Sequence, residues 1–385
     1  MNSSDEIIIL WAGWPQSRLH MQALAKEGIN FSGNTPHRII GCVNPDTKLA
    51  WWFVAEYGLG DIPVARDMSH LVELFWGKKD RVTCIVNTPV FTHTKLLHAI
   101  IDLHKQWKLS LAGVICEKLL GRHVLRATQI TEEYEKQSIP LGVVCQKYFS
   151  SWVLLAQKLL ADVDTLNETF GTHFSSGDVT IAGVEVYFEK DRTQRSLRAK
   201  TNNLHHGKAP WTHFELPHMA AIVDAILWEI GTLRSIGGQD MIANISDLRA
   251  WWAAEHPTCI HGERVIIKHH AGWTATTSVW DKRVTLHSSL VSPTRRREVV
   301  IKLSNEHTLH IHLDPGETKN PESQLELRGP QGTTLGKTQS EPDNSLGVCL
   351  KAMFNAISSG SPMPSDARRH IGLLRFLDEA DNLLG

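Results

Sequence analysis

The sequence lacks three features that would assign it at once to a broad class of protein. Its 40 Lys and Arg residues are balanced by 41 Asp and Glu residues, so it has no basic excess of the kind expected of a nucleic-acid-binding protein. Its longest apolar runs, at residues 7–11 and 109–116, fall short of the roughly 20 apolar residues needed to span a bilayer. Residues 1–6 are polar and acidic, unlike a signal peptide. We expect a cytoplasmic protein that binds neither nucleic acid nor a membrane.

Cysteine is scarce, and no two of the six cysteines form the C-x-x-C pair typical of zinc and redox sites. Most lie inside apolar runs, which favours reduced thiols in the core over disulfides. The sequence contains 21 histidines, but their spacing matches no metal-binding motif. His310 and His312 share one face of an expected strand, yet no third ligand stands at a readable spacing. We therefore expect no metal site.

A length of 385 residues predicts two domains. In the first 149 residues, short and almost continuously apolar segments alternate with helical patterns, as a parallel sheet covered on both faces requires. This pattern predicts a doubly wound α/β domain of the Rossmann type. Its strands are expected near residues 7–11, 38–43, 82–86, 112–116 and 140–144, and its helices near 17–27, 49–57, 92–107 and 125–135.

Residues 150–385 have a different pattern, in which apolar and polar residues alternate within longer strands. Such alternation predicts an α+β domain with an open, mainly antiparallel sheet, one face of which is wet or covered by a partner. Residues 314–345 are polar and rich in Gly and Pro, and we expect a loop containing one short strand. Strands are expected near 179–188, 264–270, 273–280, 297–303, 308–313 and 324–327, and helices near 151–162, 216–231, 245–255, 346–358 and 365–384, the last two closing the structure.

The first strand-to-helix turn is where a nucleotide-binding sheet places its phosphate site, because glycines let backbone N–H groups approach the diphosphate. Here the turn contains Ala12, Gly13, Trp14, Pro15 and Ser17, with one glycine instead of three. Trp14 and Pro15 are bulky enough to crowd a diphosphate. A tight structural turn is therefore the alternative to a cofactor site.

Polar residues also follow the other strands of this domain, at the edge where open α/β sheets bind ligands. Asn44 ends the second strand, and a neutral residue at this position does not distinguish NAD from NADP as the cofactor. The alternative is that Asn-Pro-Asp only forms a turn and caps the following helix. Thr88, Pro89 and His93 follow the strand at 82–86, and a Glu-Lys pair at 117–118 follows the next one.

Lys118 is the strongest catalytic candidate at this edge. Its ammonium group can donate a proton to a substrate oxygen, and its amine can accept one. A solvated lysine at the end of a strand is the alternative interpretation.

Together these positions resemble the glucose–fructose oxidoreductase / inositol dehydrogenase / MocA family of NAD(P)-dependent oxidoreductases, over nearly the whole chain. His20 matches the histidine that ends the family's Gly-rich turn. Thr88, Pro89 and His93 match Thr-Pro-Asn-x-x-His, with Val90 in place of Asn, and Glu117 and Lys118 match Glu-Lys-Pro, with Leu119 in place of Pro.

The family's second catalytic motif is Asp-x-x-x-His at the start of a helix. His218 matches its histidine, whereas Phe214 occupies the Asp position and Glu215 lies one residue away. The resemblance therefore implies a role in proton transfer or substrate orientation for His218, with Glu215 as a candidate substitute for the Asp.

The resemblance implies hydride transfer between a nicotinamide cofactor and a carbonyl, imine or secondary alcohol of a polar small molecule, with Lys118 as the acid/base group. The cofactor, NAD or NADP with a slight preference for NADP, is expected to contact Ala12, Gly13, Trp14, Pro15, Ser17, Asn44, Thr88, Pro89, His93 and Glu117. Pairing through the open sheet implies a homodimer or homotetramer. Two alternatives stay open: a cofactor-free binding or partner subunit, and a lyase or hydrolase that uses the nicotinamide only transiently.

Overall fold

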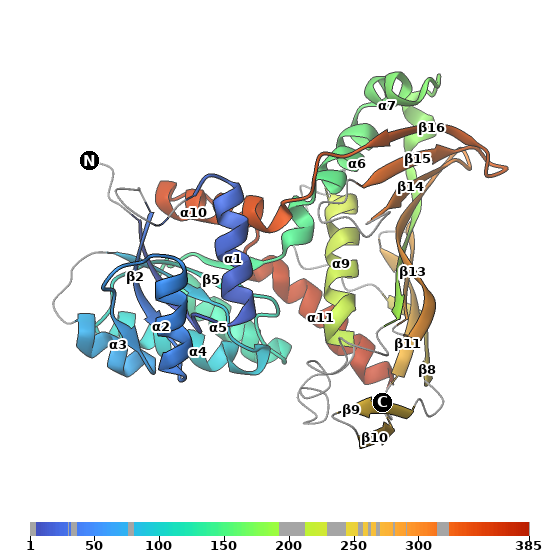
Figure 1. The fold of residues 1–385 in the computed structure, drawn as a ribbon. Coiled ribbons are helices and arrows are strands. Elements are labelled where there is room, and N and C mark those ends of the chain that lie inside the picture. Colours follow the sequence, from blue (N-terminus) through green and yellow to red (C-terminus); the bar gives the residue numbers. More distant parts are fainter. Residues whose placement is uncertain are drawn as a thin grey trace. The chain divides into compact units, whose positions relative to one another are not determined.

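The computed structural model describes residues 5–29, 31, 37–75, 81–191, 212–228, 244–252, 257–260, 263–266, 270–279, 282–289, 291–313 and 323–384; over 212–216, 244–273 and 291–295, among others, it describes the backbone alone. The chain divides into two compact units (Figure 1). Unit 1 comprises residues 1–149 and 344–374, and unit 2 comprises residues 150–343 and 375–385.

Unit 1 contains the expected parallel sheet. Its strands are β1 (Asp5–Leu10), β2 (His37–Val43), β3 (Val64–Ala65), β4 (Val82–Val86), β5 (Leu111–Glu117) and β6 (Leu141–Val144). They lie in the order β3-β2-β1-β4-β5-β6, and every neighbouring pair is parallel. This order confirms the doubly wound prediction. Because the order reverses between β1 and β4, their carboxyl ends form the edge where ligands bind in such sheets.

The crossover helices of unit 1 are α1 (Pro15–Lys26), α2 (Thr47–Glu56), α3 (Met68–Phe75), α4 (Val90–Lys105) and α5 (Val124–Lys136). Pro15 suits the first position of α1, where the missing N–H costs no helical hydrogen bond. Asp46 caps α2 by accepting hydrogen bonds from the amides of Lys48 and Leu49. Each of these helices except α3 was expected to within a few residues; β3 and α3 are too short to leave a periodic pattern in the sequence.

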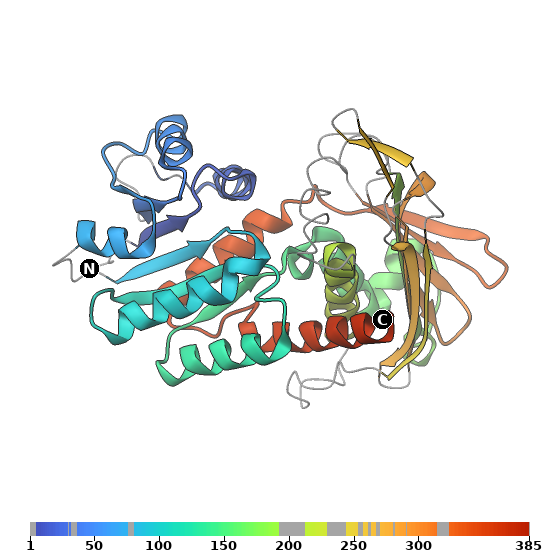
Figure 2. The same cartoon turned by 90° about the horizontal axis from the view of Figure 1, so that it is seen from below.

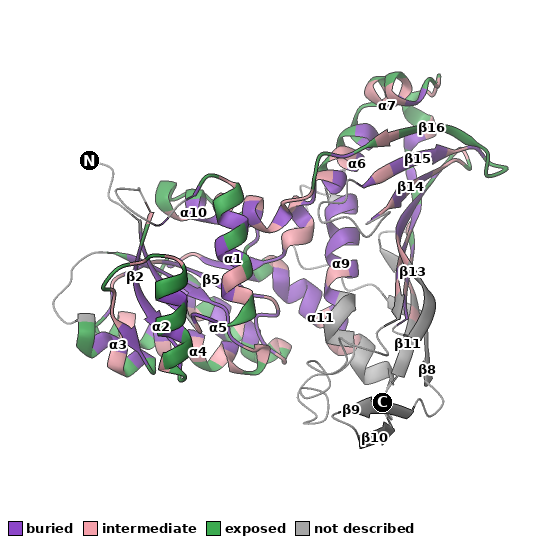
Figure 3. Ribbon diagram, viewed as in Figure 1, coloured by how far each residue is buried: buried purple, intermediate pink, exposed green. Residues whose placement is uncertain are grey.

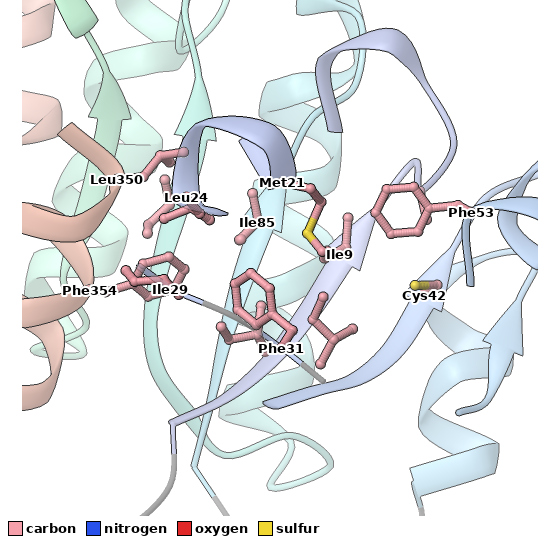
Figure 4. Close-up of a cluster of buried hydrophobic side chains, with 14 of the residues drawn as sticks. Ile9, Met21, Leu24, Ile29, Phe31, Cys42, Phe53, Ile85, Leu350 and Phe354 are labelled. Atoms are coloured by element: carbon pink, nitrogen blue, oxygen red, sulfur yellow. The ribbon is translucent and has the colours of Figure 1, made fainter. Parts of the chain in front are cut away.

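Helix α10 (Ser345–Ser359) belongs to unit 1, although the sequence placed it in the second domain. Its Leu350 and Phe354 are buried in the same hydrophobic cluster as Leu24 of α1 (Figure 4). A Cβ at Gly347 would stand 2.4 Å from the carbonyl oxygen of Ala23, so only glycine lets α10 pack this closely on α1. The C-terminal segment therefore completes the core of unit 1.

Unit 2 is built on an eight-stranded sheet in the order β16-β15-β14-β13-β7-β12-β11-β8. Only β7 and β12 pair in parallel. Helices α6 (Ser151–Ala161) and α9 (Thr212–Trp228) pack on one face (Figure 2). The strands are β7 (Ile181–Asp191), β8 (Asn244–Trp252), β11 (His270–Val279), β12 (Lys282–Ser289), β13 (Val291–Leu303), β14 (Thr308–His312), β15 (Gln324–Arg328) and β16 (Thr334–Gln339), with β9 (Pro257–Ile260) and β10 (Glu263–Ile266) in a separate hairpin and α7 (Val163–Phe170) after α6.

The expected helix at residues 245–255 is wrong, because the segment forms strand β8. Its helix-forming residues and apolar spacing favour a helix locally, but the segment pairs antiparallel with β11, with irregularities at His270/Gly272 and Thr276/Thr277. Strand β16 was likewise missed in the stretch expected to hold a single short strand. The open, mainly antiparallel sheet itself is confirmed.

Burial follows the sheets (Figure 3). Cys42, Cys84, Cys116, Cys145 and Cys349 are buried free thiols, as expected; Cys259 lies outside the residues whose side chains are described. Burial raises the pKa of Cys42 and Cys84 to about 12, so both stay protonated and unreactive at neutral pH. Among the described helices, none combines the length and the apolar character needed to cross a membrane.

Candidate functional site

The turn between β1 and α1 requires its single glycine. Gly13 has a φ of +87°, and a Cβ there would lie 2.4 Å from the carbonyl oxygen of Leu49 in α2. Trp11 also adopts a positive φ, of 61°, and its amide donates to the carbonyl oxygen of Val43 at the end of β2. The turn is therefore tied tightly to β2 and packed against α2.

Ala12, Trp14 and Ser17 stand at the spacing of the three glycines in the dinucleotide motif G-x-G-x-x-G. Ala12 and Ser17 are fully buried, and the Ser17 hydroxyl donates to the carbonyl oxygen of Trp14 at 2.8 Å. Such small residues still permit the tight turn and the close helix–strand packing that the first and third glycines provide. Trp14 is different: its side chain is 40% exposed and makes an edge contact with Trp11, with ring centroids 5.6 Å apart.

The polar residues at the end of β2 already support the turn. The Asn44 amide donates to the carbonyl oxygen of Ala12 at 2.7 Å and accepts from the amide of Asp46 at 2.9 Å. The Asp46 carboxylate caps α2. The end of β2 therefore carries a neutral, buried amide, and the nearby Asp46 carboxylate is bonded to backbone amides of α2.

Asn87, directly after β4, is a buried amide without a hydrogen-bond partner. Its side chain is 1% exposed, and neither Oδ1 nor Nδ2 has a partner among the described residues. Leaving such a group unpaired costs on the order of 1–3 kcal/mol. This residue was not among the expected site residues, although the sequence signal existed: Asn87 is the first polar residue after an apolar strand.

His93 joins the ends of β4 and β5. It is completely buried, with Nε2 2.7 Å from the carbonyl oxygen of Thr88 and Nδ1 in contact with the carbonyl oxygen of Leu119. Burial lowers the pKa of His93 despite these contacts and the nearby Glu117 carboxylate. The Thr88 hydroxyl accepts from Thr92 at 2.6 Å. The geometry assigns the His93 imidazole to holding two strand ends together.

Glu117, the last residue of β5, is a buried carboxylate at the same edge. Its Oε1 accepts from Gln16 Nε2 at 2.7 Å and lies 2.6 Å from His20 Nε2, both on α1. Burial alone would raise the pKa of Glu117, but His20, Lys118 and Gln16 lower it, and the net shift is downward. His20 Nδ1 is buried without a hydrogen-bond partner among the described residues. An ionised carboxylate thus supports an imidazole that still has one unused nitrogen.

Lys118 is half-buried directly beyond this carboxylate, and its peptide bond to Leu119 is cis. Its charge acts on Glu117 and on His370 of α11 (Ala367–Leu384), lowering the pKa of both. Burial, Lys118 and His93 together lower the pKa of His370 to about 3, so its Nε2 stays free to accept from the Leu120 amide at 3.2 Å. No sequence motif pointed to His370, which lies about 250 residues further along the chain.

His218 lies on α9 of unit 2, one residue after Pro217 within the helix, and is half-buried. The backbone of Glu215 is part of the same helix, but its side chain lies outside the described residues. The sequence-predicted residues of unit 1 lie at the carboxyl edge of its sheet, in the turns that follow it or in the first turn of the next helix: Ala12, Gly13, Trp14, Pro15, Ser17, Asn44, Thr88, Pro89, His93, Glu117 and Lys118.

Solved structures of other proteins are similar to this chain, although no protein-family model and no curated protein matches the sequence. An oxidoreductase from Agrobacterium radiobacter, solved with NAD+, L-tartaric acid and magnesium, is similar with a TM-score of 0.68 and 14% identity over 98% of this chain and 96% of that one. A 3-ketoreductase from Actinomadura kijaniata, solved with NADP and TDP-benzene, is similar with a TM-score of 0.67 and 10% identity over 98% and 97%. Both structural neighbours are oxidoreductases solved with a nicotinamide dinucleotide bound, and at such identities they establish the shared fold.

Proposed function

We propose that this chain is an NAD(P)-dependent oxidoreductase, which transfers a hydride between a nicotinamide cofactor and a carbonyl, imine or secondary alcohol of a polar small molecule. The observation that carries the proposal is the unpartnered, buried Asn87 amide at the carboxyl end of β4, beside the point where the strand order reverses. A nicotinamide dinucleotide has carboxamide, hydroxyl and phosphate groups that can supply the missing hydrogen bonds.

The residues of unit 1 fit such a cofactor at this edge. Asn87 and Thr88 present polar groups after β4, and Glu117 with His20 presents them after β5. The turn from Ala12 to Ser17 would hold the diphosphate in altered form, because Trp14 replaces the second glycine and Pro15 has no N–H to donate.

The preference between the two cofactors rests on Asn44. A carboxylate at the end of β2 usually binds both ribose hydroxyls of NAD, and it would repel the 2′-phosphate of NADP. Asn44 is neutral, and the adjacent Asp46 carboxylate is engaged in capping α2. We therefore propose that NADP is preferred.

Lys118 is the acid/base group of the proposed reaction. When bound, the nicotinamide supplies or accepts the hydride. During reduction, the Lys118 ammonium donates a proton to the substrate oxygen or nitrogen as that atom gains the electron pair of its double bond; during oxidation, the neutral amine takes the proton back. The Lys118 charge in turn helps to lower the pKa of the neighbouring Glu117. His218 is proposed to orient the substrate or relay the proton, with Glu215 as its candidate partner.

The test is calorimetric titration of the full-length protein with NADPH and with NADH. We expect binding of at least one, tighter for NADPH, and a weakening on the order of tenfold to a hundredfold in Asn87→Leu, which removes both hydrogen-bonding atoms of the amide. Asn355→Leu is the matched control, because Asn355 lies exposed on α10 of the same unit. Absence of binding of either cofactor would instead leave a cofactor-free binding subunit, and turnover without net change at 340 nm would indicate a lyase or hydrolase.

For the assembly, we propose that two copies pair through the eight-stranded sheet of unit 2. The face opposite α6 and α9 presents half-buried polar side chains such as Glu185 and Tyr187. Light scattering of the purified protein tests this proposal, because a monomeric mass at micromolar concentration would contradict it.

A further inference from the structure

Three chemistry-bearing side chains meet on the sheet of unit 2, and none of them is assigned to the proposed reaction. His310 and His312 alternate with buried Leu309 and Ile311 along β14, so both histidines lie on the face opposite α6 and α9. Glu298 of β13 pairs directly with His312 in the ladder, which puts it on the same face. The sequence did not reveal this third residue because it lies on a different strand.

The distances suit a shared cation. Glu298 Oε1 lies 2.7 Å from His310 Nδ1 and 3.7 Å from His312 Nδ1. One ligand atom from each of the three residues lies within 4.8 Å of the others. A tetrahedral ion with bonds of about 2.0–2.2 Å separates its ligand atoms by about 3.4 Å, so small side-chain rotations suffice to surround it.

Two of the three side chains, His310 and Glu298, are already held through the atom that would not bind the ion. His310 Nε2 lies 3.1 Å from the Thr308 hydroxyl, and His312 Nε2 lies 3.5 Å from Glu326 Oε2. Arg296 donates to Glu298 Oε2 at 2.6 Å and 2.8 Å, which leaves Oε1 directed at the imidazoles. Metal-binding histidines and carboxylates are commonly held in this way, through the atoms that do not bind the ion.

An ordinary ion-pair cluster accounts for the arrangement less well. A distance of 3.7 Å is too long for a hydrogen bond between His312 Nδ1 and Glu298, so the carboxylate bonds one imidazole and leaves the other merely near it. The Glu298 side chain is only 9% exposed, whereas that of His312 is 30% exposed. A cation between the three atoms brings both imidazoles into bonding distance of one centre.

We propose that Glu298, His310 and His312 form a binding site for a divalent transition-metal cation, with Zn²⁺ the best-fitting ion. Two imidazoles and one carboxylate are a ligand set that Zn²⁺ favours, and three protein ligands leave a fourth position for water or a ligand. Binding requires both Nδ1 atoms to be unprotonated, with the ring proton of each imidazole on Nε2.

The probe is Co²⁺, because tetrahedral or five-coordinate cobalt absorbs visible light whereas Zn²⁺ does not. We expect the full-length protein, stripped with a chelator, to develop cobalt d–d bands with a stoichiometry of one and to lose them on addition of Zn²⁺. His312→Gln and His310→Gln should abolish the bands. Thr308→Val, which removes only the oxygen beside His310 Nε2, should weaken binding about 10- to 100-fold.

The control is His287→Gln, on the same sheet, where the imidazole contacts Glu189 at 3.1 Å and Thr274 at 2.7 Å and belongs to no cluster of three metal-ligating groups among the described residues. This variant should bind cobalt like the parent protein. Bands that survive His312→Gln, or that fall equally in His287→Gln, would overturn the proposal and assign binding to other histidines. Absence of cobalt bands in the folded parent protein would overturn it as well.

Discussion

Gly13→Ala tests how tightly the first turn is packed. Two costs add. At a φ of +87°, an alanine is destabilising by about 1–2 kcal/mol because its Cβ is crowded in left-handed backbone. Its methyl group would also stand 2.4 Å from the Leu49 carbonyl oxygen, a backbone atom that cannot rotate away, so α2 or the turn must shift at a further cost of about 1–3 kcal/mol. The expected loss of stability is therefore about 2–5 kcal/mol.

Gly28→Ala is the matched control. Gly28 has a φ of +74° just beyond α1, but nothing lies within 4 Å of a Cβ there. Gly28→Ala should therefore lower the free energy of unfolding only by the backbone penalty of about 1–2 kcal/mol. The lower conformational entropy of the unfolded alanine chain partly offsets this loss. The difference between the two variants thus isolates the contact with Leu49.

The assay is urea denaturation of both variants beside the parent protein, followed by tryptophan fluorescence, with NADPH titration of the folded proteins. We expect Gly13→Ala to have the lower midpoint and to bind NADPH more weakly, because the turn that would hold the diphosphate has moved. Equal urea midpoints for the two variants would show that the close contact with the Leu49 carbonyl oxygen costs no stability, and would refute this account of the turn.

Two further predictions concern the edge of the sheet. Lys118→Ala should lower turnover about 10²- to 10⁴-fold while leaving NADPH binding within a few-fold, since a positioned acid/base group is lost; turnover within a few-fold of the parent would remove Lys118 from the mechanism. His370 has a folded-state pKa of about 3, below its ordinary 6.5, so between these pH values it is protonated in the unfolded chain and neutral in the folded one. The free energy of unfolding should therefore fall as the pH drops from about 6.5 toward 3. His370→Gln should flatten part of this decline in urea midpoints measured across that range, and an unchanged slope would contradict the assignment.

The sequence predicted the parallel sheet of unit 1 well for a physical reason. Strands buried on both faces, such as β4 and β5, need nearly continuous apolar residues, and this composition is visible without knowledge of the fold. The direction of a parallel sheet then places the residues after each strand at one edge. Thr88, Glu117 and Lys118 could therefore be identified as neighbours of a common edge from the chain alone.

Other features depend on partners distant in sequence. The segment at 244–252 has a local helical pattern but pairs with β11, and helix α10 joins unit 1 because Gly347 permits close contact with α1. Sequence periodicity reports which face of an element is apolar, and it carries no information about which distant surface covers that face.

The sequence by itself determined the two sheet types and the edge at which polar residues collect, because burial imposes a local pattern of side chains. Only the tertiary structure decided which polar atoms are satisfied. It leaves the Asn87 amide and His20 Nδ1 buried without partners among the described residues, and it brings Glu298 to His310 and His312 from a neighbouring strand. Hydrogen-bond partners and metal ligands are set by distances of a few ångströms between segments far apart in the chain, and such distances exist only once the chain has folded.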